Sequence, residues 1–266
     1  MISSRKYYSL FKMSVQTSLA YRLNFLINSI SGIVFITVLY YLWKAIYVEN
    51  TEVGQMTWDD MKCYLVIVFI SNTLLSWYSE SALSKRILDG SVSMDLLKPL
   101  NFHIARFFET MGTSMVEGGV SVFLAIIWVI VINGIKMPED NWFIFLFSIS
   151  LCLSLILKYC VVYLASLFCF WTSSSQGIAW ARTAITNLFS GALIPLSLFP
   201  DWLATIAKWL PFQGIVYIPA SIYLGHMSII KAIQQMVLQL FWILLLWGTV
   251  LFIWRWAIRK VIIHGG

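Results

Sequence analysis

Charged residues are scarce in this chain of 266 residues, in which Asp, Glu, Lys and Arg together make up 11% of the sequence. Soluble domains average about 25%. Hydrophobic residues make up 60% instead, and their runs are far longer than the roughly ten residues of a membrane β-barrel strand. The composition therefore argues against a soluble domain and predicts an all-α integral membrane protein. The net charge of +6 follows membrane topology, as shown below, so we expect no nucleic-acid partner.

Motifs for nucleotide, metal and disulfide chemistry are also missing. No Gly-x-x-x-x-Gly-Lys-Ser/Thr sequence occurs, so the chain has no loop that could cradle the phosphates of ATP. The three histidines lack metal-ligand or acid–base partners at useful spacing, and the four cysteines form no Cys-x-x-Cys pair. We therefore expect a chain that is not an enzyme and holds neither a metal nor a cofactor. We also expect no removable signal peptide, because the basic N-terminal stretch precedes no cleavage signal.

Apolar segments long enough to cross a bilayer, which takes about 20 residues per helix, occur six times. They cover residues 23–43, 63–80, 109–132, 142–170, 180–199 and 232–254. We expect one six-span domain over residues 23–266, preceded by an amphipathic helix over residues 1–22. The apolar residues of that helix recur at helical spacing (Leu10, Phe11, Val15 and Leu19), which suits a helix lying on lipid headgroups. A frayed basic tail is the alternative.

Lysine and arginine gather in alternate connections between these segments. With the N-terminus inside, most of them fall on the inner side, whereas the outer loops are rich in Asp and Glu. Cytoplasmic loops carry such an excess of positive charge. The distribution therefore predicts a multi-pass protein of a plasma membrane whose N-terminus and C-terminus are both cytoplasmic.

The segment 201–225 before the last span is too apolar for a solvated loop. A seventh span here would put the basic C-terminal residues outside, and Pro211 and Gly214 divide the segment into pieces too short to cross. We expect a re-entrant extracellular helical hairpin, with the preceding span bent by Pro195 and Pro200. The alternative is a flat interfacial helix that places Trp202 and Trp209 in the aromatic belt.

The inner loop 81–106 carries an apolar cluster where a polar connection is expected. A turn at Asp89-Gly90, a cap at Ser91 or Ser93 and a stop at Pro99 predict a short helix between two breakers, with Asp95 near its positive end. Asn101 then caps the next helix. The apolar side of this short helix consists of Met94, Leu96, Leu97 and Leu100. It either meets a partner or packs on the protein or on lipid, and the residues alone do not decide between these.

Two ionisable residues, Glu117 and Lys158, fall inside predicted spans. Such residues usually face a bundle interior or a cavity. They pair or snorkel in a structural role, or they line a polar path. Small residues on the third span, Ser114, Gly118 and Ser121, are candidates for close packing against another membrane chain.

Three segments, RILDGSVSMDLLKPL (86–100), GALIPLSLFPDWL (191–203) and LPFQGIVYIPASIYLG (210–225), are similar to recurring segments in one branch of a transporter family. The chain resembles the permease subunit of a type-2 ATP-binding-cassette (ABC) exporter. The resemblance covers nearly the whole chain and rests on the order and spacing of the three segments together. For the contact between permease chains it favours spans one and five instead, with Gly32 and Gly191, and the two possibilities stay open.

The resemblance implies that the loop 81–106 docks on a separate ABC ATPase subunit, two copies of which bind ATP and Mg, and that a second permease chain completes a homo- or heterodimer in a bacterial plasma membrane. The implied docking residues, with Leu96 and Leu97 as anchors, are Gly90, Met94, Asp95, Leu96, Leu97, Lys98, Pro99 and Leu100. The implied second cytoplasmic contact consists of Ser174, Gln176 and Arg182. The implied outer exit is lined by the hairpin residues Trp202, Trp209, Pro211 and Phe212.

Two other functions remain open. The first is an ion-coupled secondary transporter that uses Glu117 and Lys158, although such proteins usually contain inverted repeats and no internal repeat is evident here. The second is a membrane scaffold without transport. The substrate also stays open, since members of the resembled family move drugs, peptides, lipids or glycans.

Overall fold

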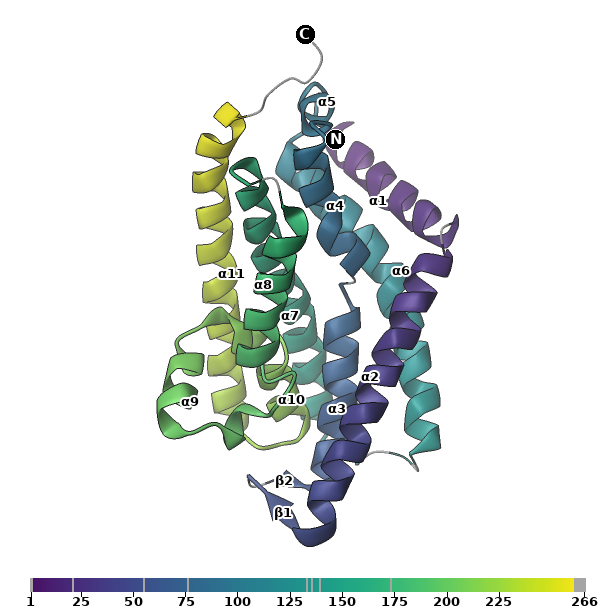
Figure 1. Cartoon of the computed structure of the whole chain (residues 1–266), viewed down its shortest axis with the longest axis vertical. Coiled ribbons are helices and arrows are strands. Elements are labelled where there is room, and N and C mark those ends of the chain that lie inside the picture. Colours follow the sequence, from purple (N-terminus) through teal and green to yellow (C-terminus); the bar gives the residue numbers. More distant parts are fainter. Residues whose placement is uncertain are drawn as a thin grey trace.

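The computed structural model describes residues 2–20, 22–54, 56–75, 77–132, 134, 136–138, 140–172 and 174–260. Most of this chain is α-helical (Figure 1). The helices of its first half are α1 (Ile2–Ala20), α2 (Arg22–Glu49), α3 (Trp58–Thr73), α4 (Trp77–Leu88), α5 (Val92–Leu96) and α6 (Phe102–Val131). Those of its second half are α7 (Asn141–Leu167), α8 (Ser175–Phe189), α9 (Asp201–Lys208), α10 (Tyr217–Tyr223) and α11 (Ile229–Ala257).

Short elements join these helices. The strands β1 (Glu52–Val53) and β2 (Met56–Thr57) pair antiparallel, with Glu52 opposite Thr57. The 3₁₀ turns are η1 (Phe168–Phe170), η2 (Leu196–Leu198), η3 (Pro211–Gly214) and η4 (Ile258–Lys260). Figure 1 shows α5, the start of α1 and the end of α11 at one end of the molecule and β1, β2 and α9 toward the other. The C-terminal residues 261–266, expected in the cytoplasm, lie outside the described residues.

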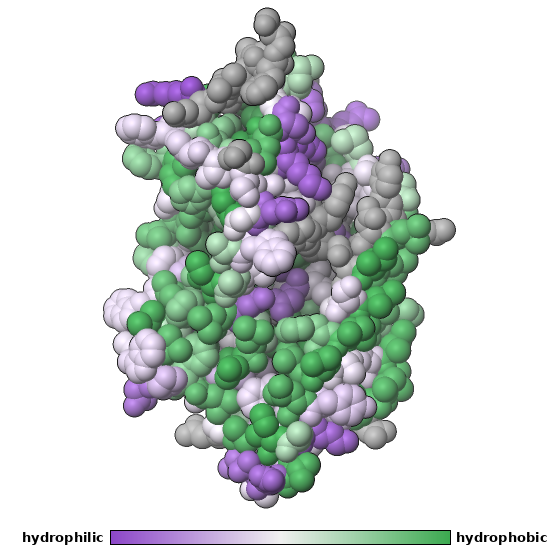
Figure 2. Space-filling view, in the orientation of Figure 1, coloured by the Kyte–Doolittle hydropathy of each residue, from purple (hydrophilic) through white to green (hydrophobic). Residues whose placement is uncertain are grey.

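Four segments of the described chain are long and apolar enough to cross a membrane. They are Ser29–Glu49, Phe102–Val131, Asn141–Phe170 and Ile229–Ala257. Large apolar side chains on these segments point outward, and Figure 2 shows that hydrophobic residues cover much of the middle of the visible face. An apolar outer surface of this kind suits lipid rather than water. The all-α prediction is confirmed, and four of the six predicted spans coincide with these segments.

The second predicted span, 63–80, is two helices rather than one. Helix α3 ends at Thr73, and α4 begins at Trp77. The last residues of α3 are Ser71, Asn72 and Thr73, but Leu74, Leu75 and Trp77 follow them, so a count of hydrophobic residues over the whole segment did not detect the break. Since the two helices end and begin within a few residues, their terminal backbone groups need partners from elsewhere in the fold.

The fifth predicted span, 180–199, also differs, because α8 ends at Phe189. Gly191 follows with a φ of 86°, a left-handed conformation that favours glycine. The Tyr64 hydroxyl donates a hydrogen bond of 2.7 Å to the Gly191 carbonyl, and a Cβ on Gly191 would lie 2.5 Å from that hydroxyl oxygen. Pro195 and Pro200 therefore follow the end of the helix, and the expectation that they bend it is corrected.

The segment 201–225 combines the two arrangements expected for it. Helix α9 lies at the rim of the bundle with Trp202 and Trp209 exposed, whereas α10 is buried beside α7. The buried Gln239 side chain of α11 fixes the turn between them by donating to the Gly214 carbonyl at 2.7 Å. The first half thus resembles the interfacial helix, and the second half enters the bundle. Insertion into a membrane leaflet stays a prediction.

Helix α1 packs against α6. Its most buried described side chain is Ser14, whereas Leu19 of the predicted apolar stripe is exposed. The reason is Gly112 of α6, where a Cβ would lie 2.6 Å from the Phe11 carbonyl oxygen. Because the two backbones approach so closely, α1 turns a face with small side chains toward α6. Its predicted position on a membrane surface is untested.

Candidate functional site

The short helix α5 stands at one end of the bundle between the two breakers that the sequence indicated. Gly90 has a φ of 74°, which suits glycine. The Asn101 side chain caps α6 by accepting from the Ile104 amide at 3.2 Å, as predicted. Ser91 occupies the N-cap position of α5 but makes no capping bond with its side chain. The Ser91 amide instead donates to Asp89 at 2.9 Å, so the predicted serine cap is wrong.

The apolar residues of α5 and its end divide into two groups. Met94 is 65% exposed and Leu97 is 79% exposed. Leu96 is partly buried and packs against the hydrophobic core below, and Leu100 is also partly buried. The remaining residues implied for docking, Lys98 and Pro99, are exposed. The face available to a partner is therefore centred on Met94 and Leu97, because Leu96 already has neighbours within the chain.

Asp95 points the other way and attaches α5 to the bundle. It is 8% exposed, and its carboxylate accepts from Arg86 of α4 at 2.8 Å and from Lys98 at 2.7 Å. Arg106 of α6 lies 3.5 Å from the same carboxylate. Burial by itself would raise the pKa of Asp95, but the hydrogen bonds from Lys98 and Arg86 outweigh it and lower the pKa. Asp95 is thus an ionised anchor rather than only a charge near the start of a helix.

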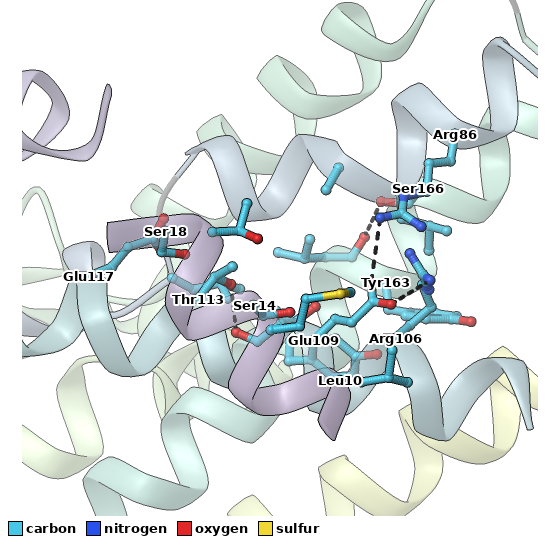
Figure 3. Close-up of a pocket in the computed structure, with 18 of the residues that line it drawn as sticks. Leu10, Ser14, Ser18, Arg86, Arg106, Glu109, Thr113, Glu117, Tyr163 and Ser166 are labelled. Atoms are coloured by element: carbon cyan, nitrogen blue, oxygen red, sulfur yellow. Dashed lines mark hydrogen bonds and ion pairs between the residues drawn. The ribbon is translucent and has the colours of Figure 1, made fainter. Parts of the chain in front are cut away.

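The ion pairs of Asp95 continue into α6 through Arg86, Arg106 and Glu109, which are labelled in Figure 3. Arg106 donates to Glu109 at 2.7 Å, and Arg86 lies 3.5 Å from Glu109. Each guanidinium therefore contacts both carboxylates, Asp95 and Glu109. We call these residues, Arg86, Asp95, Lys98, Arg106 and Glu109, the inner charge network. The sequence analysis did not identify Arg86, Arg106 and Glu109 as site residues, although Arg106 and Glu109 stand at the i,i+3 spacing typical of helical ion pairs.

Lys158 is buried on α7 and bonds to the break between α3 and α4. Its ammonium donates to the carbonyl oxygens of Asn72 at 2.8 Å and Leu75 at 2.9 Å. Carbonyls at the end of a helix lack intrahelical partners and carry partial negative charge. Lys158 therefore supplies donors to the backbone carbonyls at the break. Glu117 is also buried, on α6, so both ionisable residues face the bundle interior, as the sequence analysis expected.

Of the residues implied for a second cytoplasmic contact, Ser174 and Gln176 lie at the start of α8 and Arg182 lies in its middle. Ser174 is its N-cap and accepts from the Gly177 amide at 3.1 Å. Gln176 is exposed, and Arg182 is partly buried and donates to Thr183 at 3.2 Å. In the hairpin, Pro211 is buried and Phe212 is partly buried, with its ring stacked on Phe189. Neither set adjoins the inner charge network through an ion pair that the structure describes.

The small residues of the third span serve packing within the chain. Ser114 and Ser121 are buried, and a Cβ on Gly118 would lie 2.9 Å from Leu74. A Cβ on Gly32 would lie 3.1 Å from Phe69 of α3. The face containing Ser114, Gly118 and Ser121 is therefore not available to a second chain in this structure, and that candidate contact is corrected.

An all-α bundle with long apolar helices and buried charges defines an integral membrane protein. The sequence matches the model of the ABC-2 family transporter protein over residues 33–265. Since this is most of the chain, the protein belongs to the ABC-2 transporter family and is a multi-pass membrane permease. No curated protein and no solved structure matches it. The resemblance noted in the sequence is thereby confirmed at the level of the family.

Proposed function

We propose that the chain is the permease subunit of an ATP-driven exporter and that α5 receives the motion of a separate ABC ATPase. Family membership supports the permease role, and the chain lacks a phosphate-binding loop of its own. The observation that carries the docking role is the two-sided character of α5. Its outward side presents Met94 and Leu97, while its inward side is bonded to α4 and α6 through Asp95.

This arrangement has a direct mechanical consequence. A force on Met94 and Leu97 reaches α4 through Arg86 and α6 through Arg106, because both guanidiniums contact Asp95. In the proposed complex, two ATPase subunits bind ATP and Mg, and a second permease chain completes the path. Helices α3 and α4 together form the second span, and α8 with the following turn forms the fifth. Both termini then face the cytoplasm of a bacterial cell.

A secondary transporter centred on Glu117 and Lys158 is the rival function. Lys158 bonds to backbone carbonyls at the helix break, which gives its charge a structural use without any ion coupling. A scaffold without transport requires no buried connection between α5 and the spans. The inner charge network therefore favours the exporter over both rivals.

The test is co-purification of the tagged chain with its ATPase from the native host in mild detergent, followed by mass spectrometry. The M94D/L97D variant places two charges on the outward side of α5 without touching the inner charge network. We expect it to reduce the ATPase yield to less than about a tenth of the wild-type yield, because burying two carboxylates without partners in an interface is costly and the few residues that dominate an interface cost about 2 kcal/mol or more when changed.

The matched control is V48D/M137D, which changes two apolar residues with exposures of 78% and 70% away from α5. It should retain the ATPase. Wild-type yield of ATPase with M94D/L97D would remove α5 as the docking surface. Absence of any ATPase with the intact wild-type chain would favour the secondary transporter, and transport that persists with an ATP-hydrolysis-dead partner would refute ATP-driven export.

A further inference from the structure

A cavity of about 390 Å³ lies beside the inner charge network, between α1, α4, α6 and α7. Its volume falls in the range of small-molecule sites, roughly 300–1,000 Å³. In Figure 3, Leu10, Ser14 and Ser18 come from α1, and Glu117 lies at the opposite end from Arg86. The docking role of α5 makes no use of this space.

Two buried polar atoms on residues that line the cavity have no hydrogen-bond partner among the residues that the structure describes. They are the hydroxyl of Tyr159, a residue that is 3% exposed, and the Nε atom of Arg106, which is also buried. A buried polar group without a partner costs about 1–3 kcal/mol, and nearly all such groups in proteins are paired. The Nε atom of Arg106 can only donate and the Tyr159 hydroxyl can donate, so a single group with acceptor atoms satisfies both.

The charge at this end of the cavity also suits an acceptor that is anionic. The inner charge network contains three cations, Arg86, Lys98 and Arg106, against the two carboxylates of Asp95 and Glu109. One positive charge remains in excess, and one added anionic group neutralises it. At the other end, Glu117 opposes a second anionic group.

The walls of the cavity carry the hydroxyls of Ser14, Thr17, Ser18, Thr110, Thr113 and Ser166 and, over a larger area, apolar side chains. The apolar side chains include Leu10 and Met13 of α1, Leu83 of α4 and Val162 of α7, together with Leu75 from the break between α3 and α4. An apolar chain in this space would be removed from water, at about 0.8 kcal/mol per buried CH₂ group. We infer that the cavity binds an amphipathic monoanion, whose carboxylate or phosphate accepts from Arg106 and Tyr159 and whose apolar chain extends along these walls.

The test uses the purified full chain in nanodiscs of zwitterionic lipid and measures binding of dodecanoate by equilibrium dialysis. Dodecanol and dodecyltrimethylammonium supply the same apolar chain with a neutral and a cationic head. We expect dodecanoate to bind at least about tenfold more tightly than either, because hydrogen bonds to charged groups contribute about 1.5–3 kcal/mol. Equal affinity for dodecanol, or preference for the cation, would overturn the inference.

The diagnostic variant is Y159F, which removes a hydroxyl without a described partner and so should not lower the melting temperature. We expect it to weaken dodecanoate binding about tenfold. The control is S114A, since Ser114 also has a buried hydroxyl without a described partner but does not line the cavity. Unchanged binding by Y159F, or an equal loss in S114A, would refute the site.

The anion has two possible sources, an inner-leaflet lipid or a soluble amphiphile. Nanodiscs that contain phosphatidylglycerol distinguish them, because competition with dodecanoate identifies a lipid headgroup and its absence identifies a soluble ligand. The inference does not depend on ATPase docking. M94D/L97D should leave dodecanoate binding unchanged, and Y159F should leave the ATPase yield unchanged. The docking proposal and the anion-binding proposal can therefore be refuted independently.

Discussion

Asp95 holds α5 against the bundle, and its replacement by Asn measures the strength of that attachment. D95N keeps the shape of the side chain but removes its charge. The bond to Lys98, which is 54% exposed, contributes less than about 1 kcal/mol. The contact with Arg86, which is 35% exposed, carries most of the rest, because it is 2.8 Å long against 3.5 Å for Arg106, and Arg106 retains Glu109 as a partner. We therefore expect a loss of about 2 kcal/mol, less than the full value of a buried ion pair.

A loss of about 2 kcal/mol raises the population of the detached helix roughly thirtyfold. Hydrogen exchange of the peptide 89–101 in nanodiscs reads this directly, because its amides exchange when α5 opens. Peptides from α7 and α11 should keep their wild-type rates, which shows that the opening is local. The control K98A should change exchange by less than about fivefold. Wild-type exchange in D95N would refute the view that Asp95 anchors α5.

Three further changes test other parts of the fold. G191A should lower the free energy of unfolding by about 2 kcal/mol, because a left-handed φ and contact with the Tyr64 hydroxyl both oppose a Cβ; an unchanged thermal melt would contradict this. K158M should also lower the free energy of unfolding by about 2 kcal/mol and speed hydrogen exchange at the α3–α4 junction, because two carbonyls lose a charged donor. Unchanged exchange at this junction would contradict the prediction. The pKa of Asp95 in the folded protein lies below the ordinary 3.8, so ionised Asp95 stabilises the fold fully above about pH 5, and this stabilisation disappears as the pH falls through the lowered pKa. The difference in melting temperature between wild type and D95N should therefore narrow only below about pH 5.

The sequence predicted the elements whose signals are local. Long apolar runs located the spans that become α2, α6, α7 and α11, because a membrane helix is recognised by length and composition alone. Gly90, Pro99 and Asn101 placed the short helix α5 for the same reason, since turns and caps depend on a few neighbouring residues.

Breaks inside apolar runs were not predictable in this way. Leu74 and Leu75 look like any residues of a span, yet the chain leaves the helix there because Lys158, more than 80 positions later, bonds to the freed carbonyls. Gly191 ends α8 early through contact with Tyr64 of α3. In both places a residue distant in sequence contacts the backbone where the helix ends, and hydropathy contains no information about that contact.

The inner charge network was missed for a related reason. From the sequence, Asp95 is a negative charge near the positive end of the dipole of its own helix, and this local position indicates no partner on another helix. Its main partners on other elements, Arg86 and Arg106, come from helices on either side of α5 in the sequence. Only the way in which α4 and α6 meet brings these residues together. The i,i+3 spacing of Arg106 and Glu109 was a usable local signal, but it did not indicate the other three members, Arg86, Asp95 and Lys98.

The two ends of the bundle are held by different interactions, and this difference bears on how the protein moves. At the end that carries α5, each guanidinium already contacts both carboxylates, so α5 can shift while Arg86, Arg106 and the two carboxylates exchange partners and stay paired. Near the other end, α10 is fixed by fully buried side chains such as Ile218 and Ile222, and moving it would open cavities that cost about 2–5 kcal/mol per large side chain. In the proposed complex, motion that enters through α5 is therefore taken up first by α4 and α6, beside the cavity that these helices share with α1 and α7.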